Sequence, residues 1–195
     1  MPTTHLLYLH GFRSSPQSTK ARKVQQRIAS RHPGVQLWCP QLPPSPAEAM
    51  TLVLQGTANW PHARMAVIGS SLGGFYAQQV AERTGCRAAV INPAVAPARD
   101  LARHVGTQST WHDPSDGFVF EPRYLDELQA LHIQAITRPE RYYALIARGD
   151  EVLDWQEMHH HFAAATCHIL PGSDHAVSDF DDHMDALLAF LDLAT

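Results

Sequence analysis

The sequence predicts an α/β protein in which a mostly parallel sheet of about six strands is flanked by helices. Short apolar runs alternate with helical patterns along most of the 195 residues, which is the order that repeated βα units produce. One apolar run leads into a glycine-flanked serine at residues 69–73 and then into a helix, and the last run is followed by His175. Hydrophobic residues make up 45% of the chain, enough for one core, so we expect a single domain over residues 1–195.

The composition argues against several classes of function. The 15 basic and 19 acidic side chains give a formal net charge of −4, so we expect no nucleic-acid partner, which would favour a basic surface. No apolar run approaches the roughly 18 residues of a membrane-spanning helix, and the N-terminus lacks the basic start and apolar core of a signal peptide. Three cysteines, Cys39, Cys86 and Cys167, are expected as reduced, buried thiols. We therefore expect a cytoplasmic protein that binds no membrane.

The six predicted strands are apolar for most of their length, and the first is apolar nearly throughout, as a central strand of a parallel sheet should be. They are residues 4–9, 35–39, 65–68, 86–91, 141–147 and 166–170. Parallel strands end at one common edge, so side chains that follow these runs are expected close together in space.

Helices are predicted from apolar residues at helical spacing and from their caps. Residues 18–30, 47–55 and 155–164 fit this pattern, and a further helix runs from the serine motif to Thr84, with Gly85 at a left-handed C-cap. Asp154 is expected to cap the helix over 155–164. The last helix carries one apolar face, and Ser178 with Asp181 resembles a capping box at its start. That face consists of Phe180, Met184, Leu187, Leu188 and Leu191.

Two charged or titratable clusters have more than one interpretation. The first helix carries five basic residues, Lys20, Arg22, Lys23, Arg27 and Arg31. We expect a solvated face, and the alternative is attraction of an anionic acyl carrier such as coenzyme A. The three histidines at 159–161 could suggest a metal, but consecutive helical residues point about 100° apart, so we expect a solvated or partly buried helix face and no metal site.

Residues 93–138 show weak periodicity, with short helical pieces at 98–104 and 124–131. An insertion between two strands at the carboxyl edge of a sheet is where a lid or an acyl pocket belongs. The candidate pocket walls are four aromatic residues, Trp111, Phe118, Phe120 and Tyr124. The alternative is that these residues only pack a small core of the insertion itself.

The glycine-flanked serine is Ser71, with Gly69 two residues before it and Gly73 two residues after it. Strand, Gly-x-Ser-x-Gly and helix in this order predict the nucleophile elbow of an α/β-hydrolase. Ser70 does not fit, because Ile68 stands two residues before it. The alternative is a glycine-rich turn of a nucleotide-binding or flavodoxin-like sheet in which Ser71 only caps the helix.

Other strand ends supply the partners that a nucleophilic serine needs. Asp150 follows the fifth predicted strand and His175 follows the sixth, so the order serine, acid, histidine is that of the hydrolase fold. Glu151 and Asp154 compete with Asp150 as the acid. No cofactor is needed for such a triad, in which the imidazole takes the serine proton.

The turn after the first strand is a candidate for half of an oxyanion hole. There the backbone N–H of Phe12 is expected to pair with that of Leu72, the residue after the nucleophile. Gly11 lets the backbone turn its amide toward the site, and His10 is expected to support the loop by hydrogen bonding rather than to act as an alternative base.

Taken together, these segments resemble the YqiA/YcfP-type esterase family of small single-domain α/β-hydrolases. The matching segments are residues 7–12, 14–16, 68–77, 92–94, 121–123, 149–154 and 172–176. The chain departs from that family at Trp155, where tyrosine is often found, and at the Ser173-Asp174 pair before His175, where glycine-asparagine is commoner. The resemblance implies esterase activity on acyl esters and acyl-CoA thioesters, with Ser71, Asp150 and His175 as the triad.

The function expected from the sequence is therefore a serine esterase acting on short- to medium-chain acyl esters or thioesters, without an obligate protein partner. The alternative is a binding or scaffold protein with the hydrolase fold and no turnover. A peptidase of the same fold is disfavoured, because the chain has no separate cap or propeller domain.

Overall fold

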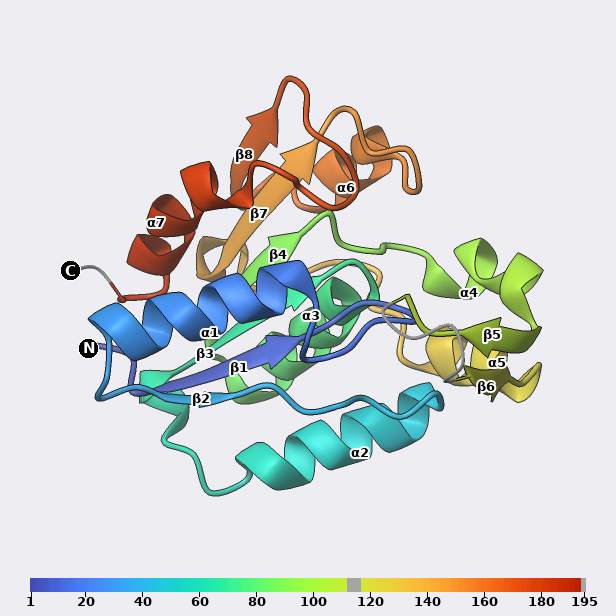
Figure 1. Cartoon of the computed structure of the whole chain (residues 1–195), viewed down its shortest axis with the longest axis horizontal. Helices are drawn as coiled ribbons and strands as arrows, with labels where there is room; N and C mark the ends of the chain where they lie inside the picture. The colour runs from blue at the N-terminus through green and yellow to red at the C-terminus, as the bar shows by residue number, and fades with distance from the viewer. Residues whose placement is uncertain (112–116, 194–195) are drawn as a thin grey trace.

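Six parallel strands form the central sheet of the computed structural model, which describes residues 1–111 and 117–193. The strand order is β2-β1-β3-β4-β7-β8, so β2 flanks β1 at one edge and the later strands are added in turn on the other side of β1 (Figure 1). The strands are β1 (His5–Leu9), β2 (Gln36–Trp38), β3 (Met65–Ser70), β4 (Arg87–Ile91), β7 (Tyr142–Ala147) and β8 (Thr166–Leu170). The predicted parallel α/β sheet is confirmed, with every predicted strand present.

Helices cover both faces of the sheet. On one face lie α1 (Thr19–Arg31) and α7 (Phe180–Phe190), side by side in Figure 1 and joined by ion pairs from Lys23 to Asp181, 2.7 Å, and from Arg27 to Asp185. The other face packs against α2, α3, α5 and α6. These helices are α2 (Pro46–Thr57), α3 (Leu72–Thr84), α5 (Arg123–Ala130) and α6 (Trp155–His161).

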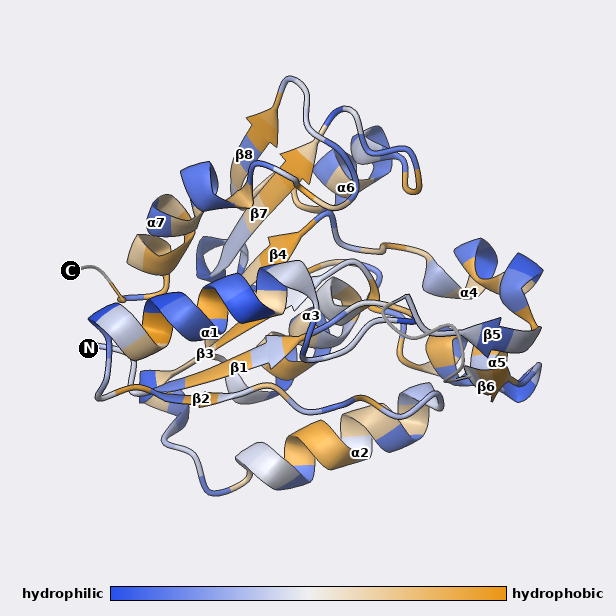
Figure 2. Ribbon diagram, viewed as in Figure 1, coloured by the Kyte–Doolittle hydropathy of each residue, from blue (hydrophilic) through white to orange (hydrophobic). Residues whose placement is uncertain are grey.

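The alternation of strand side chains creates two separate cores. In β1, Leu6 and Tyr8 pack with α1 and α7, whereas Leu7 and Leu9 pack on the opposite face. All four are at most 1% exposed, which is why the run is apolar throughout. In Figure 2 the strands of the main sheet are largely orange, which marks hydrophobic residues, whereas α1 also carries blue, hydrophilic residues.

The insertion contains an antiparallel hairpin that periodicity does not predict. It consists of β5 (Gly106–Ser109) and β6 (Gly117–Phe120), flanked by the short helices α4 (Pro97–Asp100) and α5. Figure 1 shows α4, α5 and the hairpin grouped beyond the carboxyl end of β1. The sequence of β5, Gly-Thr-Gln-Ser, has no apolar alternation, because neither of its faces is fully buried. Among the residues that the structure describes, three further segments are single turns of 3-10 helix, namely η1 (His62–Arg64), η2 (Ala102–His104) and η3 (Pro139–Arg141).

Helix ends agree with the expected caps except at α7. Gly85 has φ 73° at the end of α3, and the Asp154 carboxylate accepts a hydrogen bond from the Gln156 N–H at the start of α6. The predicted capping box is wrong: α7 begins at Phe180, after Asp179, and the Ser178 hydroxyl donates to Asp174 instead. The nearby carboxylate of Asp174 is thus a better partner for this hydroxyl than the helix amides.

Of the three cysteines expected to be buried, Cys86 is buried, whereas Cys39 and Cys167 are only partly buried. The three cysteines are free thiols, and burial raises the pKa of Cys39 and of Cys86 to about 11, so both are protonated at neutral pH. In the histidine triplet of α6, the His161 ring is hydrogen-bonded to Gln78. Among the described residues, no group of three or more His, Cys, Asp or Glu is arranged to hold a metal ion, and no helix is long and apolar enough to cross a membrane.

Candidate active site

Ser71 lies at a sharp turn between β3 and α3, with φ 57° and ψ −121°. This is a strained conformation for a residue with a side chain, and it requires close backbone approach on both sides. A Cβ on Gly69 would lie 2.1 Å from the Gly73 carbonyl oxygen, and a Cβ on Gly73 would lie 2.0 Å from that of Leu9. Both distances are far below contact, so only glycine fits at these two positions. The elbow conformation predicted from the motif is present.

Ser71, His175 and Asp150 form one continuous chain of hydrogen-bonding contacts. The distance from Ser71 Oγ to His175 Nε2 is 3.1 Å, and that from His175 Nδ1 to Asp150 Oδ2 is 2.7 Å. Because a carboxylate only accepts, the proton of a neutral His175 belongs on Nδ1, which leaves Nε2 free to accept from the serine hydroxyl. The geometry is therefore suited to moving a proton from Ser71 to His175.

The acid end of this chain is buried and held by backbone amides. The Asp150 side chain is 0% exposed, and its Oδ1 accepts from the N–H groups of Val152 and Leu153, both at 2.8 Å. Its second oxygen is left for His175, whose side chain is 21% exposed. Asp150 is thus fixed by the turn that follows β7, as a residue that orients an imidazole must be.

The two competing acids have other contacts. Asp154 caps α6 through the Gln156 N–H at 2.8 Å. Glu151 accepts a hydrogen bond from the backbone N–H of His175 at 3.0 Å, so it contacts the histidine loop but not the imidazole. Of the three candidates, only Asp150 is hydrogen-bonded to the His175 ring.

Asn92 holds the histidine loop and was missed by sequence reasoning. It is 0% exposed, with φ 40°, and its side-chain oxygen accepts from the Ala147 N–H at 2.8 Å. Its side-chain amide donates to the carbonyl oxygens of Asp174 and His175 at 3.0 and 3.2 Å. One side chain thereby joins the ends of β4 and β7 to the loop after β8. The signal available in the sequence is an asparagine directly after a buried strand.

The two proposed oxyanion donors lie beside Ser71. A Cβ on Gly11 would stand 3.2 Å from Ser71 Cβ and 3.6 Å from Ser71 Oγ, so the turn after β1 lies against the serine. Leu72 is the first residue of α3, where backbone N–H groups have no partner within the helix. Within residues 1–111 and 117–193, neither the Phe12 nor the Leu72 N–H donates a hydrogen bond to another protein group.

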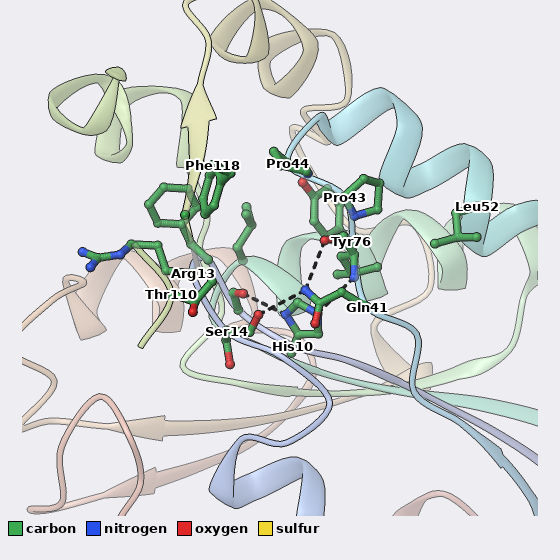
Figure 3. A pocket seen from close by; sticks show the side chains of 15 residues that line it. His10, Arg13, Ser14, Gln41, Pro43, Pro44, Leu52, Tyr76, Thr110 and Phe118 are labelled. Atoms are coloured by element: carbon green, nitrogen blue, oxygen red, sulfur yellow. Dashed lines mark hydrogen bonds between the residues drawn. The ribbon is translucent and has the colours of Figure 1, made fainter. Parts of the chain in front are cut away.

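His10 supports this turn through both ring nitrogens. Its Nε2 accepts from the Leu42 N–H at 3.1 Å, which places the ring proton on Nδ1, and Nδ1 lies 3.0 Å from the Gly11 carbonyl oxygen. The ring is 4% exposed, and Figure 3 shows it among the side chains around the turn. These contacts fit a supporting role and leave neither nitrogen free to act as a base.

Two cavities open onto the reacting atoms, and both are lined by Ser71, His175 and Trp111. One, of about 510 Å³, is largely apolar and includes Leu72, Leu101 and Leu153. The other, of about 370 Å³, is more polar and includes Lys20. A third cavity of about 520 Å³ lies on the far side of the turn, where Tyr76, Pro43 and Phe118 face it (Figure 3).

The four aromatic residues expected as pocket walls are in three different environments. Trp111 is 70% exposed and lines both cavities at Ser71, whereas Phe118 lines the third cavity and neither of the two at Ser71. Phe120 and Tyr124 are 1% and 7% exposed and pack in the hydrophobic core, with their ring centroids 5.5 Å apart. Both belong to the main core that also includes residues of β1, α2 and α3, rather than to a separate core of the insertion, and they line neither cavity at Ser71.

The basic face of α1 is largely engaged by the protein itself. Lys23 and Arg27 pair with acidic residues of α7. Lys20 Nζ donates to the Ala176 carbonyl oxygen at 2.5 Å, next to His175, and burial lowers its pKa to about 8. These contacts tie α1 to the loop that carries the histidine.

Several solved structures have the same fold. The esterase domain of a Rhodothermus marinus protein is 20% identical, with a TM-score of 0.66 over 98% of this chain and 85% of that one. Est1E from Butyrivibrio proteoclasticus is 15% identical, with a TM-score of 0.73 over 97% and 87% of the two chains. The mouse alpha/beta hydrolase domain-containing protein 10 is 15% identical, with a TM-score of 0.67 over 95% and 91%. The fold is therefore that of the α/β-hydrolases. A model of the uncharacterised protein family UPF0227 matches residues 5–192.

Proposed function

Because the chain belongs to UPF0227, the YqiA/YcfP family of esterases, and brings a serine, a histidine and an aspartate together, we propose that it is a serine esterase. Its substrates in this proposal are short- to medium-chain acyl esters and, by the same chemistry, acyl thioesters. The observation that carries the proposal is the hydrogen-bonding chain from Ser71 through His175 to the buried Asp150. A serine hydroxyl is a weak nucleophile at neutral pH, and this arrangement supplies the base that it needs.

In the acylation step, Ser71 Oγ forms a bond to the carbonyl carbon of the substrate while its proton passes to His175 Nε2. The carbonyl oxygen becomes an oxyanion in the tetrahedral intermediate. When the intermediate collapses, the bond to the leaving oxygen or sulfur breaks and the leaving group takes the proton from His175. Water then repeats the same steps on the acyl-enzyme and releases the acid.

Phe12 and Leu72 supply the charge stabilisation in this proposal. Their two N–H groups have no protein acceptor in the described part of the chain, and both residues lie next to Ser71. A donor of this kind typically contributes about 3–4 kcal/mol to transition-state stabilisation, because the oxyanion is absent from the ground state. Asp150 orients the imidazole and stabilises the imidazolium that forms.

The cavities suggest how an ester is oriented. The largely apolar cavity of about 510 Å³ suits the acyl chain, with Leu101 and Leu153 on its wall. The cavity of about 370 Å³ suits the leaving group, which must reach His175 to be protonated. Trp111 lines both and would separate the two parts of the substrate.

A catalytically silent binding protein is the competing proposal. It requires no particular relation between Ser71 and His175, and it does not explain why Asp150 is buried beside the imidazole. Loss of turnover during evolution would have removed selection on these contacts, so their joint presence favours the enzyme.

The test is hydrolysis of p-nitrophenyl butyrate by the wild type, Ser71→Ala and Ser70→Ala. Ser71→Ala should lose at least about 10⁴-fold in kcat, while Ser70→Ala is the control for removing a neighbouring hydroxyl and should remain active. A fluorophosphonate should label the wild type, and peptide mapping should place the label on Ser71. Equal rates for the wild type and Ser71→Ala would refute the serine mechanism.

A further inference from the structure

The turn that carries the Phe12 amide is held at every carbonyl group. All four carbonyl oxygens of residues 11–14 accept hydrogen bonds from residues outside this segment. The Gly11 carbonyl oxygen also accepts from the Ser14 N–H within the turn. His10 Nδ1 donates to the carbonyl oxygen of Gly11 (3.0 Å), and Gln41 Nε2 donates to that of Ser14 (3.3 Å). Trp111 donates to the two between them, from its indole Nε1 to Phe12 O (3.3 Å) and from its backbone N–H to Arg13 O (2.9 Å). Two of these four bonds come from one residue of the insertion, Trp111.

Arg13 ties the same turn to the hairpin with its side chain. Its Nε donates to the Ser109 carbonyl oxygen at 2.5 Å and its Nη2 to the Ser109 hydroxyl at 3.0 Å. The guanidinium carbon lies 4.1 Å from the centre of the Trp111 ring, which it covers. Figure 3 shows Arg13 and Ser14 beside Thr110, which lies between Ser109 and Trp111 in the sequence. The planar guanidinium thus bridges both ends of the segment 109–111.

The backbone of Arg13 is strained, with φ 58° in the left-handed region. A residue with a side chain pays roughly 1 kcal/mol or more for this conformation, which persists only where its surroundings enforce it. The contacts to Ser109 and Trp111 are the ones that Arg13 itself makes to the insertion. The Phe12 side chain is also anchored in the insertion, because its ring lies 5.8 Å from that of Phe118 and 5.2 Å from that of Phe120.

We propose that the β5–β6 hairpin is a structural part of the oxyanion hole, and that Arg13 and Trp111 are positioning residues for the Phe12 N–H. The proposal rests on the esterase function proposed above. A peptide group that can rotate must be reorganised when charge develops, which forfeits most of its stabilising effect. With Gly11 O bound to His10 and Phe12 O bound to Trp111, the peptide groups on both sides of Phe12 are fixed before substrate arrives.

Arg13→Gly is the main test, because glycine adopts a positive φ without strain while removing every guanidinium contact. We expect kcat for p-nitrophenyl butyrate to fall about 10- to 100-fold, less than the loss of a whole oxyanion donor, with KM changed less than threefold. A trifluoromethyl ketone, which forms a tetrahedral oxyanion adduct with the serine, should bind more weakly by a similar factor. Arg13→Lys should be intermediate, because an ammonium cannot make the two-point contact.

Trp111→Phe is the second variant and keeps an aromatic ring while removing the indole donor to Phe12. We expect a several-fold loss in kcat, and the affinity for the trifluoromethyl ketone should fall by a similar factor. Val119→Ala, at a residue of β6 that is 56% exposed, is the matched hairpin control and should leave both unchanged. A thermal melt of each variant checks folding.

Unchanged kcat and inhibitor affinity in Arg13→Gly and Trp111→Phe would overturn the proposal. A rise in KM with constant kcat would also overturn it, because the hairpin would then only bind substrate. Full activity of Ser71→Ala would instead overturn the esterase function itself, whatever the Arg13 variants do.

Discussion

The elbow at Ser71 and the turn at Arg13 both contain a residue with positive φ, but this conformation is stabilised by different means at the two positions. Their φ angles are 57° and 58°, and they follow two neighbouring strands, β3 and β1. The elbow is permitted by two glycines within two residues of the serine. The turn is held instead by a hairpin about 96 residues farther along the chain. One half of the site is therefore specified locally and the other by long-range contacts.

This difference determines which half can be recognised from sequence. Close backbone approach forbids a Cβ, so it leaves glycines at fixed spacing around Ser71. Hydrogen bonds to backbone carbonyls leave no such mark, because every residue has a carbonyl group. The amino-acid sequence of residues 11–14 therefore does not indicate that Ser109 and Trp111 are their hydrogen-bonding partners.

The largest expected effect is on a long-range contact, that between Asp150 and His175. Asp150→Asn should reduce kcat about 10⁴-fold, because an amide can donate to the ring and favour the wrong tautomer. Asp154→Asn is the matched control. Asparagine caps helices as well as aspartate does, so its kcat should stay within about twofold. Steady-state kinetics of both variants measure this, and the reverse result would reassign the acid.

The next effect tests the local half through stability. Gly73→Ala would place a Cβ 2.0 Å from the Leu9 carbonyl oxygen, and we expect the free energy of unfolding to fall by at least about 3 kcal/mol. Gly34→Ala is the control, because a Cβ there meets nothing within 4 Å. It should change stability by about 0.5 kcal/mol or less. Urea denaturation measures both, and similar midpoints would show that the elbow can relax around a methyl group.

The smallest effect concerns a second long-range contact, from Lys20 to the loop of His175. Burial lowers the pKa of Lys20 from 10.5 to about 8, so between these values the unfolded chain binds more protons than the folded one. The free energy of unfolding should therefore rise with pH in this window. Subtracting the same curve for Lys20→Met isolates the contribution of this side chain.

Urea midpoints at pH 7.5 and 9.5 give the sign of that difference. The wild type should gain stability relative to Lys20→Met on going to the higher pH. A difference that stays flat or falls would mean that the ammonium is not desolvated in the folded protein.

Most of the fold could be predicted because its signals are local. The six strands are recognisable by their apolar runs, and Asp150 and His175 were placed correctly after β7 and β8 because strand ends are visible in the sequence. The sheet order was not derivable in this way, since the runs do not say which of them pair.

What could not be predicted depends on neighbours distant in sequence. The hairpin has a polar first strand, and the buried role of Asn92 depends on amide and carbonyl groups of three other segments. Phe120 and Tyr124 were candidate pocket walls because aromatic side chains can either line a ligand pocket or fill a core. Only packing separates the two roles.

The strand order has a consequence for the nascent chain. After β3, each later strand of the main sheet is added beside the one made before it, so the sheet can grow outward in the order of synthesis. The serine and both amide donors are translated well before residue 175, which arrives behind the outermost strand. A partly synthesised chain can thus assemble the elbow and still lack the base of the proposed mechanism, and under that mechanism hydrolytic competence arises only as translation of this polypeptide nears its final helix.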